Sequence, residues 1–270
     1  MRVLLIGGGH THVVALRHLA RNPVAGLELH LVSPDPTTSY SGLLPGHIAG
    51  HWPRNTLEIP LETLCNAANV TFHTTEVTHF DPMKRTATFA NKSFFEFDHA
   101  SLDIGAVAAI DGPESLRTLG VPVKPLGIFA DRWSQFLADV QSQSLPPHAA
   151  VIGAGTAGIE LALSMKYHLD SLKMDNPVRV SLIERADAVL LDGTARLRKL
   201  LTKALGHAGV AVNTGASVTH ASNETLTLDS RNRVPSCFTA LATGARPHAW
   251  LAQAGMATHE GFVVVDPTLR

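Results

Sequence analysis

The sequence predicts an α/β protein of two similar three-layer units, each with a parallel sheet, helices and a small β layer. Two observations predict this fold class. A buried strand, a glycine turn and a helix follow one another twice, within residues 3–20 and 149–167. Each copy also has a similar short segment further along the chain, at 101–106 and 240–245. Two glycine-rich turns in the same order, with matching later segments, indicate a duplicated unit.

In the first unit, the apolar residues 3–6 predict a strand that is followed by a glycine turn, a helix at 13–20 and a second strand at 27–32. A strand, a helix and a second strand in this order form a βαβ unit, which requires a parallel sheet. Two further segments, 70–72 and 86–89, are expected to be strands of the small β layer.

The second unit repeats this order. It has a predicted strand at 149–152, a helix at 159–167 and a second strand at 178–183. The strands of its small β layer are expected at 210–212 and 225–228. The correspondence between the units therefore extends beyond the glycine turns.

The glycine turn of the second unit carries the pattern G-x-G-x-x-G, as Gly153, Gly155 and Gly158. The first glycine permits a tight turn, the second lets the backbone approach a pyrophosphate, and the third lets the helix pack closely on the strand. The N-terminus of the helix that follows offers unpaired N–H groups and the positive end of its dipole to the anion, and Thr156 of the turn is also expected to contact the dinucleotide. The pattern predicts a dinucleotide site on a Rossmann-like unit.

Glu184 follows the second strand of this unit. A carboxylate at this position can accept a hydrogen bond from the ribose 2′-OH and repel a 2′-phosphate, which favours NADH over NADPH. Arg185 stands beside it and can face a 2′-phosphate instead, so NADPH is the alternative.

The first unit departs from the pattern at two positions. His12 stands where the third glycine is expected, and Ser33 stands where an acidic residue would end the second strand. An imidazole at the contact of helix and strand requires wider packing, and a serine hydroxyl binds a ribose more weakly than a carboxylate does. The repeat is thus the main support for a first dinucleotide site. The residues expected to contact the dinucleotide there are Gly7, Gly9, His10, Thr11, His12 and Ser33.

Residues 7–13 (GGGHTHV) and 40–46 (YSGLLPG), together with the second glycine motif, resemble the flavoproteins that have two dinucleotide-binding domains. These include the pyridine nucleotide-disulfide oxidoreductases and the type II NADH dehydrogenases. The likeness is greatest to the NADH dehydrogenase-like flavoproteins that in some bacteria are fused to selenide, water dikinase. The resemblance implies two Rossmann-like, three-layer domains, of which the first binds FAD and the second binds NAD(P)H.

By this resemblance, residues 1–118 form the N-terminal segment of the FAD-binding domain and 119–242 form the NAD(P)H-binding domain. The proline-marked segment 120–125 supports a boundary near this point. Relatives have a second FAD-binding segment with a Gly-Asp pair after a strand that resembles 261–266. Residues 243–270 are therefore expected to be only a remnant of that segment, and the chain is expected to be C-terminally incomplete.

The resemblance also implies roles for three residues. Gly105 and Gly244 are expected in the short segments that close the two nucleotide sites. Glu160, just after the second glycine motif, is expected near the contact of nicotinamide and flavin, and so as the catalytic residue. The alternative for Glu160 is an ordinary acidic residue near the start of a helix.

The implied reaction transfers a hydride from NAD(P)H to FAD, while the protein positions the two rings. Cys65 and Cys237 form no CxxC or CxxxxC pair, so a quinone or another diffusible small molecule is expected as electron acceptor, rather than an active-site disulfide. One alternative is a nucleotide-binding regulatory or interaction module without turnover. Another is an oxidoreductase of sulfur or selenium species. Selenide, water dikinase is expected as a partner by the likeness alone, and a homodimer is a further option.

The composition excludes several other classes. A formal net charge of −1, from 22 basic and 23 acidic residues, favours neither nucleic acid nor an anionic membrane. No segment has the run of about 18 apolar residues that a membrane helix needs. The two distant cysteines indicate a cytoplasmic protein, with peripheral membrane contact as an alternative. His47 and His51 have the spacing of two metal ligands, but Gly46 and Gly50 weaken a helix there, and no metal site is expected.

Overall fold

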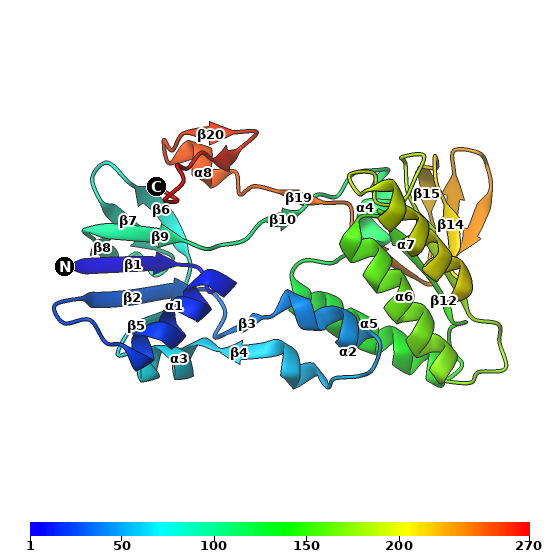
Figure 1. Ribbon diagram of the computed structural model, residues 1–270, viewed down its shortest axis with the longest axis horizontal. Coiled ribbons are helices and arrows are strands. Elements are labelled where there is room, and N and C mark those ends of the chain that lie inside the picture. Colours follow the sequence, from blue (N-terminus) through cyan, green and yellow to red (C-terminus); the bar gives the residue numbers. More distant parts are fainter. The chain divides into compact units, whose positions relative to one another are not determined.

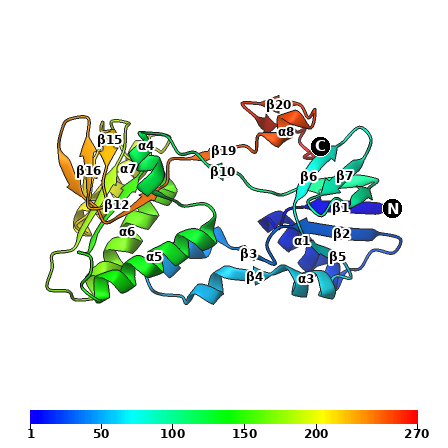
Figure 2. The ribbon, with the colours of Figure 1, turned by 180° about the vertical axis from the view of Figure 1, so that it is seen from behind.

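The computed structural model describes residues 1–270, which form two compact units (Figures 1 and 2). The first unit contains Met1–Tyr40, Glu58–Val107 and Arg246–Arg270, and the second contains Ser41–Leu57 and Ala108–Ala245. Each unit has its own parallel sheet and its own hydrophobic core.

A four-stranded parallel sheet in the order β5-β2-β1-β9 forms the centre of the first unit. Parallel neighbours need a crossover connection, and helices α1 and α3 lie in the connections that lead to β2 and β5. These elements are β1 (Arg2–Ile6), α1 (His10–Arg21), β2 (Glu28–Ser33), α3 (Leu61–Ala67), β5 (Thr71–Thr74) and β9 (His99–Leu102).

Different layers cover the two faces of this sheet, because alternate residues of a strand point to opposite sides. Leu5 packs with Leu16 of α1 and Leu61 of α3. Leu4 belongs to the cluster of the other face, with Phe80 of the antiparallel sheet β6-β7-β8, against which Trp250 of α8 also packs. The remaining elements of this unit are β3 (Thr37–Ser39), β4 (Glu58–Pro60), β6 (Val77–Asp81), β7 (Thr86–Phe89), β8 (Phe94–Glu96), α8 (Trp250–Gln253), β20 (Thr258–His259) and β21 (Phe262–Val263).

Two histidines and a glutamate form a hydrogen-bonded chain at the edge of this sheet. His30 Nε2 lies 3.1 Å from Glu28 Oε1, and His30 Nδ1 lies 2.9 Å from His73 Nε2. The carboxylate only accepts, so His30 carries its proton on Nε2, and His73 Nε2–H then donates to His30 Nδ1. Burial, followed by the nearby His30, lowers the pKa of His73 below its ordinary value of 6.5.

The lowered pKa of His73 predicts that the free energy of unfolding falls as the pH falls. The unfolded chain takes up the proton near pH 6.5 and the folded chain does so only at lower pH, so this contribution is complete above pH 6.5 and is lost below it. Urea unfolding between pH 8 and pH 5 should show the loss in the wild type and a smaller loss in His73→Gln. The exposed His79 on β6 offers a control, because His79→Gln should keep the wild-type dependence.

The second unit has a five-stranded parallel sheet in the order β11-β18-β12-β13-β14. Helices α5, α6 and α7 pack on one face, and the antiparallel sheet β15-β16-β17 packs with α4 on the other. The elements are α4 (Glu114–Leu119), β11 (Val121–Pro122), α5 (Leu126–Gln141), β12 (His148–Ile152), α6 (Thr156–Ser171), β13 (Arg179–Ile183), α7 (Ala195–His207), β14 (Ala211–Asn213), β15 (Val218–Ala221), β16 (Thr225–Leu228), β17 (Arg233–Pro235) and β18 (Phe238–Leu241).

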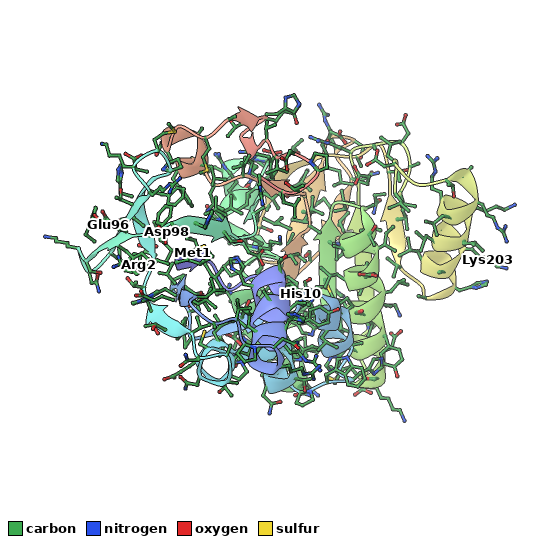
Figure 3. The ribbon with its side chains drawn as sticks, turned by 60° about the vertical axis from the view of Figure 1, so that its left-hand side comes forward. Met1, Arg2, His10, Glu96, Asp98 and Lys203 are labelled. Carbon is green, nitrogen blue, oxygen red and sulfur yellow. The ribbon has the colours of Figure 1, made fainter.

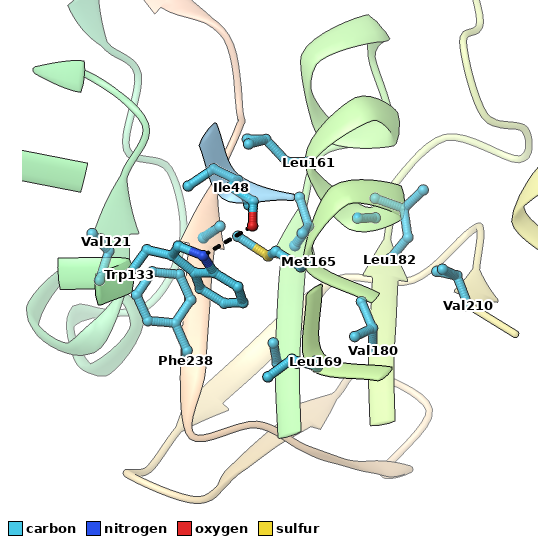
Figure 4. Packing of buried hydrophobic residues seen from close by; sticks show 14 of the residues in the cluster. Ile48, Val121, Trp133, Leu161, Met165, Leu169, Val180, Leu182, Val210 and Phe238 are labelled. Atoms are coloured by element: carbon cyan, nitrogen blue, oxygen red, sulfur yellow. Dashed lines mark hydrogen bonds between the residues drawn. The ribbon is translucent and has the colours of Figure 1, made fainter. Parts of the chain in front are cut away.

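Aliphatic side chains and a few aromatic ones fill the core between this sheet and its helices (Figure 4). Trp133 of α5 is 1% exposed and lies 5.3 Å, centroid to centroid, from Phe238 of β18. Met165 of α6 belongs to the same cluster. Burying this much aromatic and aliphatic surface is the main stabilising contribution to the unit.

Two of the strands expected in the small β layers belong to the parallel sheets instead. Residues 70–72 overlap β5, which pairs with β2, and 210–212 overlap β14, which pairs with β13. Each follows a crossover helix, α3 or α7, and such a connection returns the chain parallel to the preceding strand. Segments 86–89 and 225–228 do form the middle strands of the small layers, as β7 and β16.

Residues 41–57 belong to the second compact unit, although they come between β3 and β4 of the first. Trp133 Nε1 and His168 Nδ1 both donate to Ile48 O, at 3.2 and 2.7 Å, and hold this segment on α5 and α6. The compact units also change over at 107/108 and 245/246, and the domain boundaries at 118/119 and 242/243 stay a prediction. The elements of the segment and of the connections are η1 (Ser41–Leu43), α2 (Leu44–Ile48), η2 (Arg54–Leu57), β10 (Val107–Ala108) and β19 (Ala245–Arg246).

Candidate dinucleotide-binding sites

Both glycine loops lie at the carboxyl end of a central strand, and matching backbone hydrogen bonds fix them. Gly7 follows β1 and Gly153 follows β12. In open α/β sheets, ligands bind at these carboxyl ends. The matching bonds run from Gly7 N to Val32 O, from Gly153 N to Ile183 O, from Asp103 N to Ile6 O and from Ala242 N to Ile152 O, each at 2.8 Å.

The first glycine of each loop is required by the backbone. Gly7 has a φ of +94° and Gly153 a φ of +99°, a region that favours glycine. A Cβ atom would also lie 2.3 Å from Asp103 O at Gly7 and 2.5 Å from Ala242 O at Gly153. The tight turn of the motif is therefore present in both loops.

The other two glycines of the second loop have different surroundings. A Cβ at Gly158 would lie 1.8 Å from Gly153 O, so only glycine lets α6 begin this close to the loop. A Cβ at Gly155 would meet no atom within 4 Å, which leaves open space above the loop. Helix α6 begins at Thr156 without a side-chain cap, and its first N–H groups are available to an anion.

Glu184 is held against the second loop. Its Oε2 accepts a hydrogen bond from Ala154 N at 2.7 Å, and its Oε1 accepts one from Ala186 N at 2.9 Å. The fold thus brings together Glu184 and the glycines that the sequence singled out for this site. Two backbone donors orient the carboxylate at the end of β13.

In the first loop, His12 takes the place of the third glycine and is buried, with 2% of its surface exposed. Its Nδ1 lies 2.7 Å from Gly7 O and its Nε2 lies 2.9 Å from Ser101 Oγ. A carbonyl oxygen only accepts, so Nδ1 donates to Gly7, and in the neutral ring Nε2 accepts from the Ser101 hydroxyl. The imidazole therefore connects the start of α1 to the loop and to β9.

Asp103 contacts the N-terminus of α1 with both its backbone and its side chain. Its carbonyl oxygen accepts from Gly9 N at 3.0 Å, and its Oδ2 accepts from His12 N at 3.1 Å. Gly9, the N-cap residue of α1, has no side chain that could accept this second bond. The carboxylate of Asp103 caps the helix in its place.

The remaining predicted residues lie around these loops. Ser33 is buried at the end of β2, with its Oγ beside Gly8. His10 is exposed in the first turn of α1 (Figure 3), and its ring stacks on that of Tyr40 at a centroid distance of 5.1 Å. Thr11 on α1 and Glu160 on α6 are exposed. Gly105 and Gly244 are exposed in the segments that follow β9 and β18.

Sequence reasoning missed Ser101 and Asp103, although it singled out the segment that contains them. The signal was a difference between the two copies. The repeat aligns Asp103 with Ala242, and only the first copy has a carboxylate at this position.

The cysteines and acidic groups form no further centre. Cys65 and Cys237 are free, and burial raises the pKa of the Cys65 thiol to about 11. No three side chains of histidine, cysteine, aspartate or glutamate lie together in a way that could hold a metal ion. None of the helices combines the length and the apolar character that a membrane crossing requires.

Solved structures of similar fold cover almost all of this chain. An NAD-dependent persulfide reductase from A. fulgidus superposes with a TM-score of 0.83 at 21% identity, over 98% of this chain and 50% of its own. A sulfide:quinone oxidoreductase from Aquifex aeolicus superposes with a TM-score of 0.77 at 19% identity, over 94% of this chain and 61% of its own. NDH2 from Plasmodium falciparum, solved with NADH, superposes with a TM-score of 0.74 at 15% identity, over 91% and 55%.

The chain thus spans about half to three fifths of the length of these proteins, and their likeness shows the shared fold. A search of curated proteins gave no significant match in sequence. The family model described as pyridine nucleotide-disulphide oxidoreductase matches residues 1–270. With the two glycine loops on two three-layer α/β units, this match shows that the chain belongs to the pyridine nucleotide-disulphide oxidoreductase family.

Proposed function

We propose that this chain is the dinucleotide-binding part of an FAD-dependent NAD(P)H oxidoreductase, with FAD on the first unit and NAD(P)H on the second. The second glycine loop carries the proposal. Gly155 faces open space, Gly158 lets α6 begin against the loop, and Glu184 accepts a hydrogen bond from Ala154 N of the same loop. This is the arrangement that a dinucleotide pyrophosphate and ribose require.

FAD, when bound, supplies the group that accepts a hydride from NAD(P)H. The residues of the chain bind and orient the two dinucleotides. The uncapped N–H groups at the start of α6 hold the pyrophosphate of NAD(P)H, and Glu184 accepts a hydrogen bond from its ribose. Glu160, one turn into α6, is proposed to lie near the nicotinamide.

We propose a quinone or another small diffusible molecule as the electron acceptor. Cys65 and Cys237 belong to different compact units, and both are free thiols whose pKa values are raised by burial. They offer no dithiol for an active-site disulfide. The partnership with selenide, water dikinase and the homodimer remain predictions of the family resemblance.

Reconstitution with FAD tests the proposal. The purified chain should retain FAD after gel filtration, seen as visible flavin absorbance, and should then oxidise NADH with a quinone or dye acceptor. Binding of NADH without oxidation would support the alternative of a nucleotide-binding module without turnover. A chain that retains no flavin and binds no NADH would contradict both.

Glu184→Ala is expected to reduce the preference for NADH over NADPH by roughly tenfold, because the variant neither repels a 2′-phosphate nor binds the 2′-OH. Fluorescence titrations with both nucleotides give the ratio of dissociation constants. Glu184→Gln is the matched variant, since it removes the charge but retains an acceptor, and it should weaken NADH binding less than alanine does. An unchanged ratio in Glu184→Ala would show that Glu184 does not face the ribose.

A further inference from the structure

The surroundings of the second glycine, the position that lets a dinucleotide approach the backbone, differ between the two loops. In the second loop, a Cβ at Gly155 would enter open space. In the first loop, a Cβ at Gly9 would lie 2.1 Å from Asp103 Oδ1 and 2.4 Å from Oδ2. The carboxylate of Asp103 therefore fills the space that the second loop leaves open.

The carboxylate of Asp103 lies at the N-terminus of α1, where a negative charge is favoured. The first N–H groups of α1 and the positive end of its dipole favour an anion. The carboxylate of Asp103 supplies this negative charge, because its Oδ2 accepts a hydrogen bond from His12 N at 3.1 Å. The corresponding residue of the second unit, Ala242, has no charge and no acceptor in its side chain.

We propose that Asp103 is an internal anion of the first loop, which the pyrophosphate of a dinucleotide displaces when it binds. The carboxylate lowers the affinity of the first site, since the incoming phosphate must replace its hydrogen bond and tolerate its charge. In the empty site the same carboxylate caps α1 and maintains the shape of the loop. Asp103 is thus a positioning residue that sets the affinity of the site. The inference rests on the proposed binding of FAD by this unit.

Asp103→Asn tests the role of the charge, because asparagine has almost the same shape and also caps helices well. The variant should bind FAD roughly fivefold more tightly than the wild type at low ionic strength. The ratio of the two dissociation constants should approach one as salt is raised, because salt screens charge but does not alter packing. Flavin fluorescence titrations from low to high ionic strength measure both quantities.

The second unit offers the reciprocal variant. Ala242→Asp introduces a carboxylate at the corresponding position, where the Cβ of Ala242 lies 3.5 Å from the place that a Cβ at Gly158 would take. It should weaken NADH binding by a similar factor, with a similar dependence on salt, and should leave FAD binding unchanged. The NADH titration of Ala242→Asp does not depend on whether Asp103→Asn folds well.

Equal or weaker FAD binding by Asp103→Asn, with a ratio that salt does not change, would overturn the inference. So would unchanged NADH binding by Ala242→Asp. The failure of the proposed function looks different, because then neither the wild type nor Asp103→Asn binds FAD at any salt concentration. That outcome would contradict the flavin site itself and the inference that rests on it.

Discussion

Gly158→Ala is expected to destabilise the second unit by about 1–3 kcal/mol and to weaken NADH binding roughly tenfold to a hundredfold. The added Cβ would lie 1.8 Å from Gly153 O, a backbone atom that cannot rotate away, so α6 must move away from the loop. That movement displaces the N–H groups proposed to bind the pyrophosphate. Hydrogen bonds to charged groups contribute about 1.5–3 kcal/mol each. Urea unfolding and a fluorescence titration with NADH measure the two effects.

Gly155→Ala is the matched control, because both variants add one methyl group to the same loop. Gly155 is the N-cap of α6 with a φ of −70°, and a Cβ there meets no atom within 4 Å, so the free energy of unfolding should fall less than in Gly158→Ala, by only the small preference of an N-cap for glycine over alanine. The methyl group enters the space above the loop, and NADH binding should still weaken. If neither variant changes NADH binding, the dinucleotide does not bind at this loop.

The sequence predicts the second unit well, because its motif depends on local constraints. Gly153 needs a positive φ and Gly158 needs a close contact, and glycine alone satisfies either. Such positions can be recognised without knowledge of the rest of the fold. The fold class, with two three-layer α/β units, follows from the repeat of these strongly constrained turns.

Features that depend on distant contacts are not visible in the pattern. Strand β5 was expected in the small β layer because a short apolar segment does not show which neighbour it pairs with. Residues 41–57 pack on α5 and α6 through Ile48, 85 and 120 positions away from Trp133 and His168. The cap supplied by Asp103 spans 91 positions. Each contact depends on the complete fold and produces no periodic pattern of residues in the sequence.

His12→Ala is expected to destabilise the first unit by about 2–4 kcal/mol and to abolish retention of FAD. The substitution empties a buried site and removes the partner of two groups, the Gly7 carbonyl and the Ser101 hydroxyl. Both belong to the segments that form the proposed flavin site, so the loop should lose its fixed shape. Chemical denaturation and the flavin content of the purified protein provide the measurements. His10→Ala is the control, because His10 is exposed and its ring only stacks on Tyr40.

His12→Gly gives the first loop all three glycines of the G-x-G-x-x-G pattern. The structure predicts that this variant still lacks a stable flavin site. At Gly158 a side chain has no space, because its Cβ would clash with Gly153 O. At His12 an imidazole fits and donates a hydrogen bond to Gly7 O, the corresponding carbonyl of the first loop. Glycine at position 12 would leave that space empty and would add the flexibility of glycine to the first turn of α1. His12→Gly should therefore be at least as unstable as His12→Ala. A gain in stability or in FAD content would show that α1 can close onto β1 as α6 does onto β12, and that His12 is a tolerated departure rather than part of the site.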